Sequence, residues 1–253
     1  MEKIKNRVLT NVYGPMHKER VYMDIKTKDV EQDILYEYIA ELRNFIKQDG
    51  YPCVGARTAV NSKSLSAGVF RKMSDSRTIR ELAFGLMEYI MELKKKPSNY
   101  LTYVAIFPFD SFDDEKTFEG SLWDMLNGLH KLDSEHFEWS EHISRDPAHE
   151  RFSFSFGREG FFIVGMHPES SRKARRFRYP AIAFNLHSQF ENLRENGRYG
   201  IMKNAIRDNE MKFSGSINPM LVDFGEGLEA PQYSGRHVGN DWKCPFKGGT
   251  NEN

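Results

Sequence analysis

The sequence predicts an α+β fold: a single domain with a mixed or antiparallel central sheet, flanking helices and an irregular C-terminal wrap. Short apolar runs between turn residues indicate strands, and separate stretches with apolar residues at helical spacing indicate helices. The two kinds of stretch do not alternate regularly, which argues against a doubly wound sheet. At 253 residues the chain is long enough to bury one large core. We expect one domain over residues 1–253, with an N-terminal arm at 1–26 and a C-terminal strap at 213–253.

Two helices are predicted in the first hundred residues. The stretch 28–49 carries apolar residues at helical spacing, and a glycine and a proline then end it. The pattern Thr78-x-x-Glu81 is typical of a capping box and predicts a second helix that runs to Pro97. These helices are expected to flank the sheet.

The middle of the chain supplies the predicted strands. After the acidic stretch DSFDDE, one helical stripe of apolar residues separates the first strand from the other three. The four apolar runs lie at residues 100–107, 151–156, 160–166 and 181–186. A capping-box pattern, Ser188-x-x-Glu191, predicts the next helix, and another follows at about 199–211. The last 40 residues are rich in Gly, Pro, Asn and Asp, which indicates an irregular wrap.

Composition narrows the class of protein. Lys plus Arg and Asp plus Glu balance at 36 each, so no overall charge favours nucleic acid as a partner. Two cysteines, Cys53 and Cys244, suit a reducing compartment. The charged N-terminus lacks the apolar core of a signal peptide, and no apolar run is long enough to span a membrane. We therefore expect a cytoplasmic protein without a nucleic-acid or membrane partner.

Common catalytic and cofactor motifs do not occur in the sequence. We find no GxxxxGK[ST], GxGxxG, HExxH, paired CxxC or GxSxG pattern. Four histidines between positions 130 and 149 follow no known ligand spacing, so we interpret them as surface residues. Any redox chemistry would therefore need a reductase on another chain.

The first candidate site is YPCVGAR at residues 51–57. Cys53 lies between a proline and a valine, Gly55 allows close approach of the backbone, and Arg57 adds positive charge. A thiolate needs such charge or backbone N–H donors, and a thiolate can ligate haem iron. The alternative is a buried structural cysteine.

The second candidate site is the basic stretch between two histidines. His167 and His187 each end a predicted strand, where functional sites often collect. Between them lie basic side chains that can pair with phosphates or carboxylates, namely Arg172, Lys173, Arg175, Arg176 and Arg178. The alternative is a hydrogen-bonded core histidine beside a solvated basic face.

The third candidate site is the glycine-rich stretch 223–246. It carries Glu226 and Glu229, whose carboxylates could bind a cationic substrate. It could equally be a strap held down by its aromatic residues Tyr233, Trp242 and Phe246.

Several segments together resemble the YqcI/YcgG family. They are YPCVGAR, FEGSLWDMLNGLHKLD, GMHPESSRKARRFRYPAIAFNLHSQFENLR, GSINPMLVDFGEGLEAPQYSGR and WKCPF, and they span roughly Tyr51 to Phe246. A branch of this family includes haem-dependent N-hydroxylases that act on guanidino compounds, as in the guanitoxin pathway. The resemblance implies haem b as cofactor and O2-dependent hydroxylation of a nitrogen in a small guanidino or amino substrate, with an external reductase.

The resemblance also implies roles for the candidate residues. Arg172, Arg175 or Arg176 would pair with the haem propionates, and Glu226 or Glu229 would hold the substrate guanidinium. Cys53 is the favoured axial ligand of the iron, with His167 or His187 as the alternative. The remaining histidine would donate a proton in the distal pocket.

Two other hypotheses about the function stay open. The protein could bind haem or a gas without turnover, or bind a phosphorylated ligand through the basic residues Arg172–Arg178. A non-haem metal oxygenase that uses His167 and His187 has little support, because no carboxylate lies at the required spacing.

Overall fold

The computed structural model describes residues 21–22, 32–95 and 100–248 of the chain. Within them, six strands form one sheet in the order β1-β2-β3-β6-β5-β4. Their bounds are β1 (Val21–Tyr22), β2 (Leu65–Val69), β3 (Thr102–Ile106), β4 (Phe154–Phe156), β5 (Glu159–Met166) and β6 (Ala181–Leu186). The first three strands are parallel, whereas β6, β5 and β4 each run antiparallel to the preceding neighbour. The predicted mixed sheet in an α+β fold is confirmed.

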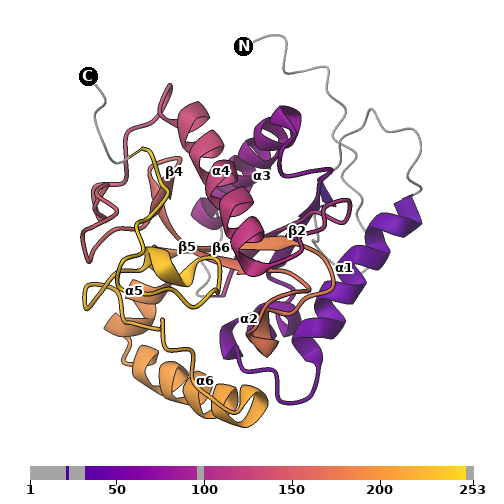
Figure 1. The fold of residues 1–253 in the computed structure, drawn as a ribbon, viewed down its shortest axis with the longest axis vertical. Helices are drawn as coiled ribbons and strands as arrows, with labels where there is room; N and C mark the ends of the chain where they lie inside the picture. Colours follow the sequence, from indigo (N-terminus) through magenta and orange to yellow (C-terminus); the bar gives the residue numbers. More distant parts are fainter. Residues whose placement is uncertain (1–20, 23–31, 96–99, 249–253) are drawn as a thin grey trace.

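Helices cover both faces of the sheet (Figure 1). One face packs against α3 (Ser76–Lys95) and α4 (Glu115–Asp133), and the other packs against α1 (Gln32–Lys47) and α2 (Val54–Asn61). At one end of the molecule lie α5 (His187–Glu195) and α6 (Tyr199–Ser214). The chain also forms two 3-10 turns among the described residues, η2 (Lys173–Arg175) and η3 (Ala230–Gln232).

The core consists of two apolar layers because side chains alternate along each strand. Tyr103 and Phe161 belong to the layer under α3 and α4, whereas Val104 and Val164 belong to the layer under α1 and α2. Trp123 of α4 is almost completely buried in the first layer. This division decides which strand residues can face a site on the α1/α2 side.

Three elements, β1, α2 and β2, were not predicted from the sequence. The strand β2 reads LSAGV, whose small residues give a weak strand signal, and the eight residues of α2 are too few for a clear apolar period. With β2 in place, α3 becomes the crossover between the parallel strands β2 and β3. The described residues therefore contain a βαβ unit, β2-α3-β3, that the sequence prediction lacked.

Both predicted capping boxes are wrong. Helix α3 begins at Ser76, and the side chain of Asp75 accepts the N–H of Arg77 at 2.9 Å, while Thr78 is buried inside the first turn. Helix α5 begins at His187, so Ser188 lies inside the helix, and no side chain caps it. The acidic stretch before α4 does cap a helix, because Asp114 accepts the N–H of Thr117 at 2.7 Å.

The C-terminal strap follows α6 and is irregular apart from η3, as predicted. Its anchor is the buried Tyr233, whose backbone carbonyl accepts the N–H of Gly165 in β5 at 2.7 Å and whose ring stacks on Trp123. The predicted arm at 1–26 lies outside the described residues except for β1. Among the described residues, no helix combines the length and apolar character needed to cross a bilayer.

Candidate functional site

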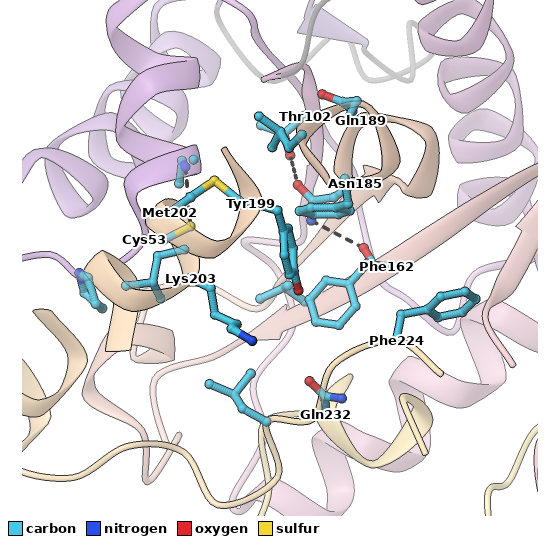
Figure 2. Close-up of a pocket in the computed structure, with 18 of the residues that line it drawn as sticks. Cys53, Thr102, Phe162, Asn185, Gln189, Tyr199, Met202, Lys203, Phe224 and Gln232 are labelled. Atoms are coloured by element: carbon cyan, nitrogen blue, oxygen red, sulfur yellow. Dashed lines mark hydrogen bonds between the residues drawn. The ribbon is translucent and has the colours of Figure 1, made fainter. Parts of the chain in front are cut away.

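A cavity of about 320 Å³ lies on the α1/α2 side of the sheet, a size that suits a small-molecule ligand. Its floor is formed by sheet residues, namely Thr102, Phe162, Val164 and Asn185. The register pairs Phe162 with Asn185, and the Thr102 hydroxyl donates to Oδ1 of Asn185 at 2.9 Å, which holds this floor together (Figure 2). The walls come from α2, α5, α6 and the strap.

One helix supplies much of the wall. Residues of α6 at helical spacing face the cavity: Tyr199, Met202, Lys203, Ile206, Arg207 and Glu210. Figure 2 shows Met202 of this helix beside Cys53 of the α2 N-terminus, whereas Phe224 of the strap lies on the far side of the view. Taken over the whole cavity, the lining is mostly apolar, and its charged groups lie at separate positions.

The charged groups of the lining do not balance. The basic ones are Arg172, Arg175, Arg194, Lys203 and Arg207, and the acidic ones are Glu210, Asp223 and Glu229. With His187 neutral, five cations against three anions leave the lining with two net positive charges. A cavity of this kind favours a ligand that carries negative charge.

Cys53 lines the cavity and is the N-cap residue of α2. Its sulfur accepts the N–H of Ala56 at 3.4 Å. Burial raises the pKa of the Cys53 thiol, while the backbone N–H groups of Ala56 and Gly55 and the charge of Arg175 act in the opposite direction. Cys53 follows α1, which ends at Lys47, and opens α2 as its N-cap residue.

The basic stretch divides into residues that reach the cavity and residues that do not. Arg172 lines the cavity and forms an ion pair with Glu210 of α6. Arg175 also lines it, is 9% exposed, and donates to the carbonyl oxygen of Tyr233 at 3.0 Å. No carboxylate of the described residues pairs with Arg175, and burial lowers the pKa of its guanidinium to about 10. Arg176 points away and donates to the carbonyl of Ser170.

Three further predicted site residues lie outside the cavity lining. Arg57 and Glu226 are exposed. His167 is fully buried on the other side of the sheet, where its ring stacks on Phe118 of α4 with centroids 4.3 Å apart. Neither ring nitrogen of His167 has a hydrogen-bond partner among the described residues, and burial lowers its pKa to about 4. The structure thus brings together Cys53, Arg172, Arg175, His187 and Glu229.

His187 and Glu229 meet in a buried polar cluster at the cavity wall. Nε2 of His187 lies 3.0 Å from Oε2 of Glu229 and 2.6 Å from Oγ of Ser153. Oε1 of Glu229 accepts hydrogen bonds from Ser153 at 2.6 Å and from the hydroxyl of Tyr233 at 2.7 Å. We call these four side chains the Ser153 cluster.

Sequence reasoning missed Ser153 and the cavity face of α6. In RFSFSF, alternation suggests that the serines face solvent, yet Ser153 and Ser155 are both fully buried. The strap and α5 cover Ser153, and nothing in the local pattern signals this. For α6, the helical recurrence of Met202, Ile206 and the charged residues between them was the available signal.

The side chains that line the cavity suit a metal that is already coordinated by an organic ring, because such a metal needs a single protein ligand. Among the described residues, no three His, Cys, Asp or Glu side chains lie together as a metal site requires. The cavity nevertheless offers a thiol and an imidazole, each of which can serve as a single axial ligand. The guanidinium groups of Arg172 and Arg175 and the mostly apolar lining could hold a flat apolar group that carries carboxylates.

Comparison with known proteins finds two similar proteins of Bacillus subtilis. It is 29% identical over 249 residues to YcgG, an uncharacterized protein of Bacillus subtilis (strain 168), covering 94% of this chain and 96% of that one. It is also 29% identical over 210 residues to YqcI, an uncharacterized protein of the same strain, covering 79% and 82%. No solved structure shows a significant match. The sequence model of the YqcI/YcgG family matches residues 42–247, and the chain therefore belongs to that family.

Proposed function

We propose that this protein is a haem-dependent monooxygenase that hydroxylates a nitrogen of a small guanidino or amino compound. The observation that carries the proposal is the cavity, which is mostly apolar, has a net positive lining and exposes both a thiol and an imidazole. Haem is a flat apolar group with two carboxylates, and its iron needs one protein ligand. The nature of the substrate rests on the resemblance to the guanidine N-hydroxylase branch.

Named residues would hold the cofactor. Arg175 is the first partner for a propionate, because it is buried and no carboxylate of the described residues pairs with it. Arg172 is the second, with Glu210 fixing its position. Either Cys53 or His187 would ligate the iron. When bound and reduced, haem supplies the activation of O2 for transfer of one oxygen atom.

The reaction balances with an external reductase. One oxygen atom of O2 forms the new N–O bond and the other leaves as water, with two electrons and two protons supplied from outside. The carboxylate of Asp223 on the lining favours a cationic substrate group nearby. Asp223 pairs with Lys203 at the wall, so its position is defined before a substrate enters.

The test is a haem titration of the purified protein followed by an oxygen-electrode assay. We expect one haem per chain with a sharp Soret band, and O2 uptake with a reductase that depends on an added guanidino compound. Mass spectrometry should then find a product heavier by one oxygen atom. A protein that takes up no haem in a defined ratio would overturn the proposal.

A second candidate function, binding of a phosphorylated ligand, is favoured by one observation. Arg175 faces the cavity without an acidic partner among the described residues, which suits any anion. The two functions differ in the titration: a phosphate binder stays colourless with haem, and it shows saturable heat of binding with a phosphorylated metabolite.

A further inference from the structure

The Ser153 cluster joins three distant parts of the chain around one point. Ser153 precedes β4, His187 begins α5, and Glu229 and Tyr233 flank η3 in the strap. All four side chains are buried, and only His187 and Glu229 of them line the cavity. A buried polar network of this kind is stable only when its hydrogens and acceptors match.

Counting hydrogens assigns the tautomer of His187. The hydroxyl of Tyr233 accepts the N–H of Phe154 at 3.0 Å and donates its own hydrogen to Oε1 of Glu229. Ser153 has one hydrogen, which Oε1 of Glu229 or the carbonyl of Phe161 accepts at 2.6 or 2.8 Å. Oγ of Ser153 can donate or accept at Nε2 of His187, but Oε2 of the Glu229 carboxylate, 3.0 Å from Nε2, can only accept, so we place the hydrogen on Nε2.

The other ring nitrogen of His187 is then the reactive one. With the hydrogen on Nε2, a neutral imidazole holds its lone pair on Nδ1. Within the described residues Nδ1 of His187 has no hydrogen-bond partner, and this atom is not completely buried. Since His187 lines the cavity, its free nitrogen is available to a ligand there.

An imidazole that donates one N–H to a carboxylate and leaves the other nitrogen free is the usual state of a metal-ligating histidine. The carboxylate fixes the ring orientation and increases the basicity of the free nitrogen. Cys53 lacks such support, because its sulfur caps α2 by accepting the N–H of Ala56. His167 is excluded from the cavity by the sheet.

We infer that His187, through Nδ1, is the axial ligand of the iron, and that Glu229, Ser153 and Tyr233 are positioning residues that hold its tautomer. This inference rests on the proposed haem function. It assigns Glu229 to the ligand and not to the substrate, because Ser153, Tyr233 and His187 already bond both of its oxygens. Cys53 is then a structural residue of the α2 N-terminus.

The experiment compares the haem-loaded protein with His187→Gly and Cys53→Ser, using His237→Gly, at an exposed strap position, as the control. We expect the ferrous–CO spectrum of imidazole-ligated haem in the wild type, in Cys53→Ser and in the control. His187→Gly should lose this spectrum and regain it with added imidazole. Circular dichroism of His187→Gly verifies that the variant folds.

A strongly red-shifted, thiolate-type CO band that persists in His187→Gly and disappears in Cys53→Ser would be the opposite result. It would overturn the assignment of His187 as axial ligand but not the proposed haem function. No haem binding in any form would overturn both. Glu229→Gln supplies a second readout, because loss of the negative charge should raise the reduction potential of the bound iron. An unchanged potential in a folded Glu229→Gln would show that Glu229 is merely structural.

Discussion

The hydroxyl of Tyr233 donates a hydrogen bond of 2.7 Å to Oε1 of Glu229 and accepts one of 3.0 Å from the N–H of Phe154. This hydroxyl therefore connects the strap to the start of β4 and to the cavity wall. Tyr233 is fully buried, so no water can replace either partner. Burial and then the negative charge of Glu229 hold the pKa of Tyr233 well above its usual range, which keeps the hydroxyl a donor.

Tyr233→Phe should lower the free energy of unfolding by about 1–3 kcal/mol, because it leaves the buried N–H of Phe154 unpartnered. Tyr38→Phe is the control, since the described residues offer the Tyr38 hydroxyl no hydrogen bond and its ring contact with Tyr179 survives. Urea unfolding monitored by fluorescence gives both values. Equal effects of the two substitutions would show that the Tyr233 hydroxyl does not hold the strap.

Arg175→Leu should weaken haem binding, whereas Arg176→Leu should not. Only Arg175 lines the cavity, although the two residues are adjacent in sequence. A lost charge-assisted hydrogen bond of about 1.5–3 kcal/mol corresponds to a rise in Kd of roughly 10- to 100-fold. Haem titrations of both variants, with circular dichroism as a folding check, measure the difference. Similar Kd values would remove Arg175 as a propionate partner.

Gly235→Ala should be more destabilising than Gly215→Ala. Both glycines have positive φ, +86° and +78°, so both substitutions meet the same backbone cost of about 1–2 kcal/mol. A Cβ at position 235 would also lie 2.6 Å from Cδ of Arg175, whereas one at 215 meets open space. Denaturation midpoints compare the two. If Gly235→Ala costs no more, Arg175 can move aside without loss.

His167 should make the protein less stable in acid. Its folded-state pKa of about 4 lies below the ordinary histidine value of 6.5, because the side chain is buried, so the unfolded chain binds the proton first. Stability from this group is complete above about pH 6.5 and is lost as pH falls towards 4. His167→Phe keeps the stack on Phe118 and should reduce the slope of unfolding free energy by up to about 1.4 kcal/mol per pH unit in this window. If His167→Phe leaves the pH dependence of the unfolding free energy unchanged, His167 does not contribute to the loss of stability in acid.

Asp133 should have the opposite pH dependence. Burial raises its pKa to about 6, so the folded state binds the proton more tightly than the unfolded chain. This group therefore destabilises the fold increasingly as pH rises from about 4 to 6. Asp133→Asn keeps an acceptor for the N–H of Gly157 and should stabilise the protein at pH 7 but not at pH 4. Asp124→Asn, at an exposed position of the same helix, is the control in thermal unfolding.

Local patterns predicted most of the secondary structure correctly. The strand β6 was predicted with its observed bounds at 181–186, because a short apolar run between turn residues has one simple interpretation. The stripes of α1 and α4 were also recognised, since helical periodicity depends only on residues a few positions apart. The strand β2 was missed because Ala67 and Gly68 carry little strand preference, and its place comes from parallel pairing with β3.

The sequence by itself determined the fold class, most elements and the family. Tertiary structure decided which candidates meet. Arg175 and Arg176 are neighbours in the chain, but η2 directs one into the cavity and the other to Ser170. The alternating pattern around Ser153 is that of a serine that faces solvent, whereas in the structure the strap covers it. Its partner Glu229 lies 76 residues away in the sequence. Contacts over such separations arise from packing of whole elements, so no local pattern of residues encodes them.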